Sequence, residues 1–154
     1  MSTELGLHNL RVLDQLEEGD IVEFKKWWLS SHYGVYVGHS DIVHVRLLSD
    51  GEALFDTLPE GIGVAKKENF WDVAGASKAY KQNIDDGTLR SLDSKTVVER
   101  AMSEIDAVFS YRLCNKQFTY WCRYGMVLRS EVEPLVQIFE DVGYYIDTKI
   151  LGPR

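Results

Sequence analysis

Two histidines, His32 and His44, stand twelve residues apart in a stretch rich in β-branched and aromatic residues. An imidazole is the usual general base of enzymes, because its unperturbed pKa of about 6.5 lies near neutral pH. Such a base needs a second polar group that orients its ring and fixes its tautomer. The pair therefore indicates a base and its orienting partner. The alternative is that both are structural or solvent-facing residues of strands.

The nucleophile that such a base would activate is Cys114, near the start of a predicted helix. The unpaired N–H groups and positive dipole end of a helix N-terminus lower the pKa of a thiol, and the thiolate facing an imidazole performs acyl transfer. Cys114 also precedes Phe118 by four residues and Cys122 by eight, so the three share one helix face. In the alternative interpretation this face belongs to the core. For Cys122 we predict a buried structural role.

The histidines need strands that hold them side by side. Short runs of β-branched and aromatic residues, bounded by turn residues, predict strands at residues 20–25, 32–37 and 41–46. Antiparallel pairing about the turn at 38–41 would bring His32 and His44 to neighbouring positions across the ladder. A further strand of the same sheet is predicted at 64–73.

Helices are expected to pack on this sheet. Residues 94–105 predict one with Ser94 as its N-cap, and residues 108–113 an extended segment that leads into a helix at 114–124, closed by Gly125. Near the start of the chain a short helix or an ordered arm is predicted from leucines at helical spacing, which are Leu7, Leu10, Leu13 and Leu16.

The region 75–95 is polar and rich in turn signals. It contains the adjacent carboxylates Asp85 and Asp86, followed by a glycine. Two carboxylates without partner ligands nearby are a weak metal signal. We therefore predict a loop there, and no metal site.

A length of 154 residues is typical of one domain, so we predict a single domain over residues 1–154. Its 45% hydrophobic and 12% aromatic residues are enough to form an ordinary core. The net charge of −7 and the absence of a Lys/Arg stripe argue against a nucleic-acid partner. Cys114 and Cys122 lie too far apart on one helix to form a disulfide, which fits the reducing cytosol. No signal of basic and then apolar residues opens the chain, so we expect a cytoplasmic protein.

Two tryptophans, Trp27 and Trp28, follow two lysines between the first two predicted strands. In one interpretation they fold onto the core beside the hairpin. In the other they form an interfacial anchor, with the rings among lipid headgroups and the ammonium groups on anionic lipid. The second interpretation would place a peripheral membrane contact beside His32.

Several motifs follow one another in a fixed order: GDIVEF at 19–24, SHYGVYVG at 31–38, IVHV at 42–45, NFWDVAG at 69–75, NIDD at 83–86, VVERA at 97–101 and CRYG at 122–125. Together they resemble the lecithin:retinol acyltransferase family. That family includes small phospholipase A and acyltransferase enzymes called H-Ras-like suppressors, and it is a permuted relative of the NlpC-type papain-like peptidases. The resemblance covers roughly residues 15–130 and leaves 131–154 as a C-terminal extension.

The resemblance implies an α+β fold, a small antiparallel β-sheet packed on helices in the permuted papain-like arrangement. It implies that Cys114 attacks the ester carbonyl of a phospholipid or other acyl lipid, that His32 takes and returns the proton, and that His44 orients His32. Trp27, Trp28 and Tyr33 are the expected substrate or membrane contacts. No metal or organic cofactor is expected.

One departure from the family pattern concerns the nucleophile. The family reads Asn-Cys-Glu-His-Phe, with the cysteine three residues before the phenylalanine. Here the residue three before Phe118 is Asn115, and Cys114 stands one residue earlier, after a lead-in about three residues shorter. A shift of one residue turns a helical side chain by about 100° and moves it about 1.5 Å. A fixed helix would misplace Cys114, whereas a helix that begins differently would return it to His32.

Three hypotheses follow. The first is an acyltransferase or phospholipase A-like hydrolase, and the second is an inactive homologue that binds a protein or a membrane. A thiol peptidase or amidase is the weaker third. Residues 127–146 are interrupted by charges, so we expect no membrane-spanning helix there, and 135–142 predict an amphipathic helix that caps the core or mediates dimerisation.

Overall fold

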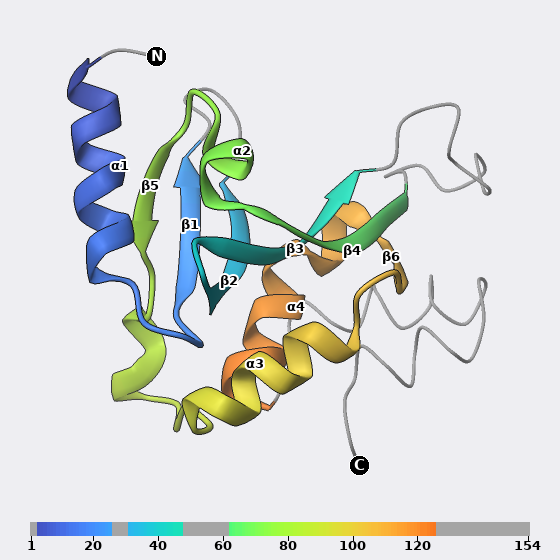
Figure 1. Ribbon diagram of the computed structural model, residues 1–154. Coiled ribbons are helices and arrows are strands. Elements are labelled where there is room, and N and C mark those ends of the chain that lie inside the picture. Colours follow the sequence, from blue (N-terminus) through green and yellow to red (C-terminus); the bar gives the residue numbers. More distant parts are fainter. Residues whose placement is uncertain (1–2, 26–30, 48–61, 126–154) are drawn as a thin grey trace.

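The computed structural model describes residues 3–25, 31–47 and 62–125, with Leu47, Ile62 and residues 109–115 described by their backbone alone. Figure 1 shows one layer of strands with helices packed on it, so the predicted α+β class is confirmed. Trp27, Trp28 and the predicted helix at 135–142 lie outside the described residues.

The sheet is antiparallel throughout, and its six strands in the described ranges have the order β5-β1-β2-β3-β4-β6. Its central hairpin strands are β1 (Ile21–Lys25), β2 (His32–Gly38) and β3 (Asp41–Leu47). They match the predicted strands to within one residue. The tight turn between β2 and β3 has His39 and Ser40 at positive φ, as expected of a short hairpin.

The next strand, β4 (Ile62–Asn69), is shorter at its end than the sequence predicted. Residues 70–73 were expected to continue it, but Phe70–Ala74 form the short helix α2. The cause is local, because the Asn69 side chain accepts a hydrogen bond from the Trp71 N–H at 3.0 Å and so caps a helix. Phe70 and Val73 of this helix are buried against the sheet.

The strand β5 (Lys78–Lys81) was not predicted, since it lies in the region expected to be a loop. It forms one edge of the sheet, and α1 (Thr3–Gln15) lies along it (Figure 1). Fully buried Asn9 donates to the Ser77 carbonyl at 3.0 Å and accepts from the Ala79 N–H at 2.9 Å. His8 Nε2 lies 2.8 Å from the Ala79 carbonyl oxygen. Side chains of α1 thus occupy edge groups that another strand would otherwise pair.

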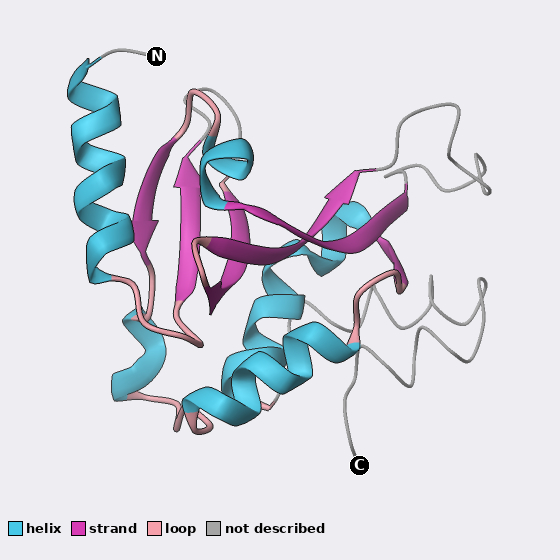
Figure 2. Cartoon of the chain, viewed as in Figure 1, coloured by secondary structure: helices cyan, strands magenta, loops and turns pink. Residues whose placement is uncertain are grey.

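Two further helices cover one face of the sheet (Figure 2). The helix α3 (Ser94–Ser103) is capped by Asp93, whose side chain accepts from the Thr96 N–H, so the predicted cap at Ser94 is wrong by one residue. The short strand β6 (Val108–Ser110) leads directly into α4 (Tyr111–Tyr124). The predicted helix therefore begins three residues earlier than expected, and residues 111–113 are helical instead of extended.

The core lies on both faces of the sheet. On the α3/α4 face, alternate residues of the central strands pack with the helices, among them Val35, Val43, Val45, Ala101, Phe118 and Cys122. On the opposite face, residues of the sheet pack with α1 and α2, among them Leu16, Val22, Phe24, Ile42, Phe70 and Val73. This alternation is the period of two that a strand imposes.

The adjacent carboxylates Asp85 and Asp86 lie in η1 (Ile84–Gly87), a single 3₁₀ turn. Asp85 accepts from the Tyr120 hydroxyl, and Asp86 accepts from Arg123 Nη2 at 2.6 Å and from the Tyr124 hydroxyl at 2.8 Å. The Arg123 hydrogen bond lowers the pKa of Asp86. Burial and the Asp86 carboxylate raise the pKa of Tyr124 to about 12. Both carboxylates therefore join this turn to the end of α4.

Candidate functional site

The two histidines lie in contact on adjacent strands. Gly34 pairs with His44, so His32, two residues before Gly34 on β2, is the diagonal neighbour of His44 on the same face of the sheet. The rings are nearly perpendicular, with centroids 5.0 Å apart. His32 Nε2 and His44 Nδ1 are 2.7 Å apart, which is a short hydrogen bond, and both side chains are buried. The predicted proximity of the two histidines is confirmed.

Gly34 makes room for this diagonal contact. A Cβ at that position would lie 2.5 Å from Ile42 Cγ2 and 3.3 Å from His44 Cβ. Ile42 is fully buried and has a stiff β-branched side chain, so it has little freedom to move away. The glycine therefore lets β3 approach β2 closely enough for the two rings to meet.

A third residue, Glu68, joins the pair, and the sequence did not reveal it. Glu68 lies on β4 opposite Ile42, which makes it the diagonal neighbour of His44 on the other side of β3. His44 Nε2 is 3.1 Å from Glu68 Oε1, and Arg46 Nη1 is 3.7 Å from the same oxygen. The residue stands 24 positions after His44, beyond a connection whose length does not determine the β3–β4 register. Residues 64–68 read Val-Ala-Lys-Lys-Glu, without the alternation of apolar and polar residues that would indicate which face Glu68 occupies.

The helix α4 begins at the same end of the sheet as His32. Leu47 pairs with Gly63, and Gly63 pairs with Phe109, so the end of β3, the start of β4 and the end of β6 are aligned. β2 begins beside the end of β3 because the two strands are antiparallel. Since α4 follows β6 without a break, the helix that contains Cys114 starts from this same end.

Cys114 and Asn115 are the fourth and fifth residues of α4. They thus belong to the first turn and the start of the second, where the N–H groups and the helix dipole favour a negative charge. The structure therefore meets the expectation that this cysteine lies near a helix N-terminus. The contact of Cys114 with His32 stays a prediction. The alternative, in which Asn115 occupies the position of the nucleophile, also stays a prediction.

The later part of the same helix is core. Phe118 is buried at 1% exposure and Cys122 at 0%, both against the valines of β2 and β3. Burial raises the pKa of the Cys122 thiol well above its ordinary value, so the thiol stays protonated. The predicted structural position of Cys122 agrees with its burial.

Tyr33, an expected substrate or membrane contact, points to the α4 face. Its ring lies 5.8 Å from Lys116 Nζ, and its hydroxyl donates to Glu23 Oε2 at 3.4 Å. It packs against a buried cluster that includes Tyr120 of α4. These contacts give Tyr33 a packing role on the α4 face, and its role toward substrate stays a prediction.

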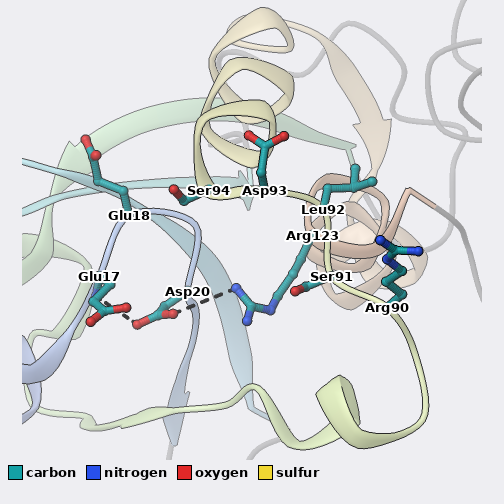
Figure 3. A pocket seen from close by; sticks show the side chains of 9 residues that line it. All are labelled: Glu17, Glu18, Asp20, Arg90, Ser91, Leu92, Asp93, Ser94 and Arg123. Atoms are coloured by element: carbon teal, nitrogen blue, oxygen red, sulfur yellow. Dashed lines mark hydrogen bonds and ion pairs between the residues drawn. The ribbon is translucent and has the colours of Figure 1, made fainter.

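A surface hollow of about 700 Å³ lies at the other end of the sheet, where β1 begins and α4 ends (Figure 3). Charged side chains dominate its lining, including Glu17, Asp20, Arg90 and Arg123. Asp20 accepts a hydrogen bond from the Glu17 N–H at 2.8 Å and forms an ion pair with Arg123 Nη1 at 3.8 Å, so these polar groups of the lining interact with one another. Neither histidine lines this hollow.

Comparison with known proteins gives consistent matches. The family model described as lecithin retinol acyltransferase matches residues 14–128. Phospholipase A and acyltransferase 3 of Homo sapiens is 26% identical over 126 residues, which covers 77% of this chain and 76% of that protein. The protein of the same name from Pongo abelii matches with the same values. Among the described helices, none has the length and apolar character required to cross a membrane.

Proposed function

Because the chain belongs to the lecithin retinol acyltransferase family, we propose that it is a thiol-dependent acyltransferase or phospholipase A that acts on phospholipid acyl esters. The observation that carries the proposal is the buried hydrogen bond of 2.7 Å between His32 and His44. Two adjacent imidazoles at one end of a sheet form a base and its orienting partner. The relatives named for phospholipase A and acyltransferase activities support the substrate class.

In the proposed reaction, His32 takes the proton of the Cys114 thiol, and the sulfur attacks the ester carbonyl carbon. The tetrahedral intermediate collapses as the C–O bond breaks, and His32 gives its proton to the departing lysophospholipid oxygen. The acyl chain is then held as a thioester. Water, an amine or a hydroxyl of another lipid attacks this thioester with His32 as base, and the thiol is restored.

Burial of the two rings supports their use in this chemistry. His32 is 9% exposed and His44 5%. A hydrogen bond in such surroundings is electrostatically stronger than one in water, and it holds the imidazole in one orientation. A base held in this way does not have to be ordered when the substrate arrives.

A second candidate is an inactive homologue that binds a protein or a membrane. It is favoured by the register of α4, in which buried Phe118 and the terminating Gly125, with φ of +73°, fit the family pattern. Counting from that anchor, the position of the nucleophile holds Asn115. An amide is no nucleophile, so the protein would then keep the histidines without the chemistry.

The first test is the rate of Cys114 alkylation by iodoacetamide against pH, in a Cys122→Ala background. If the dyad is assembled, Cys114 reacts with an apparent pKa well below about 8.5. His32→Ala should then slow the reaction at pH 7 by about tenfold or more. An unreactive Cys114, or one that His32→Ala leaves unchanged, contradicts the dyad.

The second test is hydrolysis of phosphatidylcholine vesicles by three proteins. They are the natural chain, Cys114→Ser, and the exchange of Cys114→Asn with Asn115→Cys, which restores the family order. Turnover by the natural chain that is lost in Cys114→Ser supports the enzyme. Turnover by the exchanged protein alone supports the inactive homologue, because it shows that the remainder of the site is intact.

A further inference from the structure

We propose that Glu68 is a positioning residue of this site, whose carboxylate sets the tautomers of both histidines and makes Nδ1 of His32 the basic atom. The role of His32 as a catalytic base rests on the proposed function. The assignment of the tautomers is independent of that function, since it follows from the hydrogen bonds among three described side chains.

The three side chains form one continuous line across three neighbouring strands. His32 on β2, His44 on β3 and Glu68 on β4 occupy successive diagonal positions on the same face of the sheet. The two links measure 2.7 Å from His32 Nε2 to His44 Nδ1 and 3.1 Å from His44 Nε2 to Glu68 Oε1. Both nitrogen atoms of the His44 ring therefore have a hydrogen-bond partner, Nδ1 with His32 and Nε2 with Glu68.

The position of each proton follows from what each group is able to donate. An ionised carboxylate only accepts, so the hydrogen between His44 and Glu68 must lie on His44 Nε2. A neutral imidazole carries one N–H, so His44 Nδ1 holds a lone pair and accepts from Nε2–H of His32. The neutral ring of His32 then holds its own lone pair on Nδ1. The opposite tautomer of His44 would set a lone pair against the carboxylate at 3.1 Å.

The surroundings of Glu68 keep its carboxylate available for this role. Arg46 Nη1 lies 3.7 Å from the oxygen that faces His44, and the Glu68 side chain is 31% exposed. Solvent and a guanidinium both donate hydrogen bonds, and a carboxylate accepts them. When His32 takes a proton from a thiol, the line of hydrogen bonds connects the new positive charge to this carboxylate, as the aspartate does in a Ser-His-Asp triad.

The test is the tautomer of each ring, read from long-range ¹H–¹⁵N correlations of the full chain at a pH where the rings are neutral. Resonances of His32 and His44 are assigned with His32→Gln and His44→Gln. We expect both rings as Nε2–H tautomers. In Glu68→Leu, His44 should give the averaged nitrogen shifts of a tautomer mixture. The matched control is Asp106→Asn. This substitution removes a carboxylate that accepts a hydrogen bond of 2.6 Å from Lys66, a residue of β4 like Glu68, and it should leave the tautomers of both histidines unchanged.

An Nδ1–H tautomer of His44 in the natural chain overturns the inference, and so does an unchanged His44 pattern in Glu68→Leu. If Glu68→Leu does not fold, the tautomer in the natural chain still decides. Where vesicle turnover is measurable, Glu68→Leu should lower kcat roughly tenfold or more with KM nearly unchanged. An inactive chain with the expected tautomers defeats the proposed function alone, and an active chain with the other tautomer defeats this inference alone.

Discussion

Gly34 lies opposite His44 in the β2–β3 ladder, and the histidine contact depends on its lack of a side chain. The two cysteines also differ in their surroundings. Cys122 is surrounded by core side chains, and its thiol is a packing group. Cys114 has a backbone position near a helix N-terminus, which favours a thiolate. At the scale of single residues, environment rather than residue type distinguishes a structural group from a chemical one.

Gly34→Ala should lower the free energy of unfolding by about 1–3 kcal/mol, because the added methyl group would overlap Ile42 Cγ2 and press on His44. Urea denaturation followed by circular dichroism measures the change. Gly87→Ala is the control, since a Cβ there meets nothing within 4 Å, and it should change the stability by less than about 0.5 kcal/mol. Equal effects of the two substitutions would contradict the steric argument.

Cys122 should be inert in the folded protein, because burial raises the pKa of its thiol and excludes reagents. We expect iodoacetamide at pH 8 to modify it about 100-fold or more slowly than in denaturant, where the thiol is exposed. Mass spectrometry of the peptides distinguishes it from Cys114. Modification at similar rates in the native and denatured states would show that the thiol is accessible.

At the scale of elements, α1 covers the β5 edge of the sheet in the place where a further strand would pair. Its contribution is specific, since buried Asn9 donates to the carbonyl of Ser77, just before β5, and accepts from the N–H of Ala79 within it. At the other side of the sheet, β6 determines where α4 begins, because the helix follows the strand without a break. The start of α4 at Tyr111 is therefore a property of the β4–β6 pairing as much as of the helix sequence.

Asn9→Ala should lower the free energy of unfolding by about 2–4 kcal/mol, because it leaves the Ser77 carbonyl and the Ala79 N–H without their side-chain partner in a buried place. Thermal and urea unfolding measure the loss. Leu10→Ala is the control on the same helix, since Leu10 is 44% exposed, and we expect a change below about 1 kcal/mol. A loss for Asn9→Ala no larger than that of the control would count against the edge contact.

At the scale of the whole molecule, Arg123 at the end of α4 connects parts of the chain that are distant in sequence. It donates to the Gly19 carbonyl at 2.8 Å and to Asp86 of η1 at 2.6 Å. These bonds join the start of β1, the η1 turn and α4 at the end of the sheet opposite the histidines. The CRYG motif at 122–125 therefore has a structural explanation, separate from catalysis.

Asp86→Asn tests this connection through pH. The folded pKa of Asp86 is depressed below its ordinary value of 3.8, so its charged form stabilises the fold above that pH, and this contribution is lost as pH falls through the folded pKa. We expect Asp86→Asn to cost about 1 kcal/mol at pH 7, a small value because Asp86 is 40% exposed. In urea titrations the difference from the natural chain should begin to shrink as pH falls below 3.8 and should keep shrinking as pH falls through the folded pKa. A difference that is independent of pH would mean that the charge is not involved.

The sequence by itself determined the β1–β2–β3 hairpins, the proximity of His32 and His44, the α3 helix and the family. These depend on local signals, namely alternation within short strands, turn residues at 38–41 and helical spacing at 94–105. Histidine proximity follows from a tight turn, since a short connection leaves little choice of register. The α+β class then follows from the elements themselves.

Only the tertiary structure decided the β5 edge strand, the α2 turn, the role of Asn9 and the place of Glu68. Asn9 and Ala79 are 70 residues apart, and His44 and Glu68 are 24 apart, so no local pattern relates the members of either pair. The register of β4 against β3 depends on which side chains of β4 are buried on each face of the sheet. A shift of one residue would turn Glu68 to the other face. That choice is made by the packing of the whole sheet against its helices, which is why the third member of the histidine line could not be read from the chain.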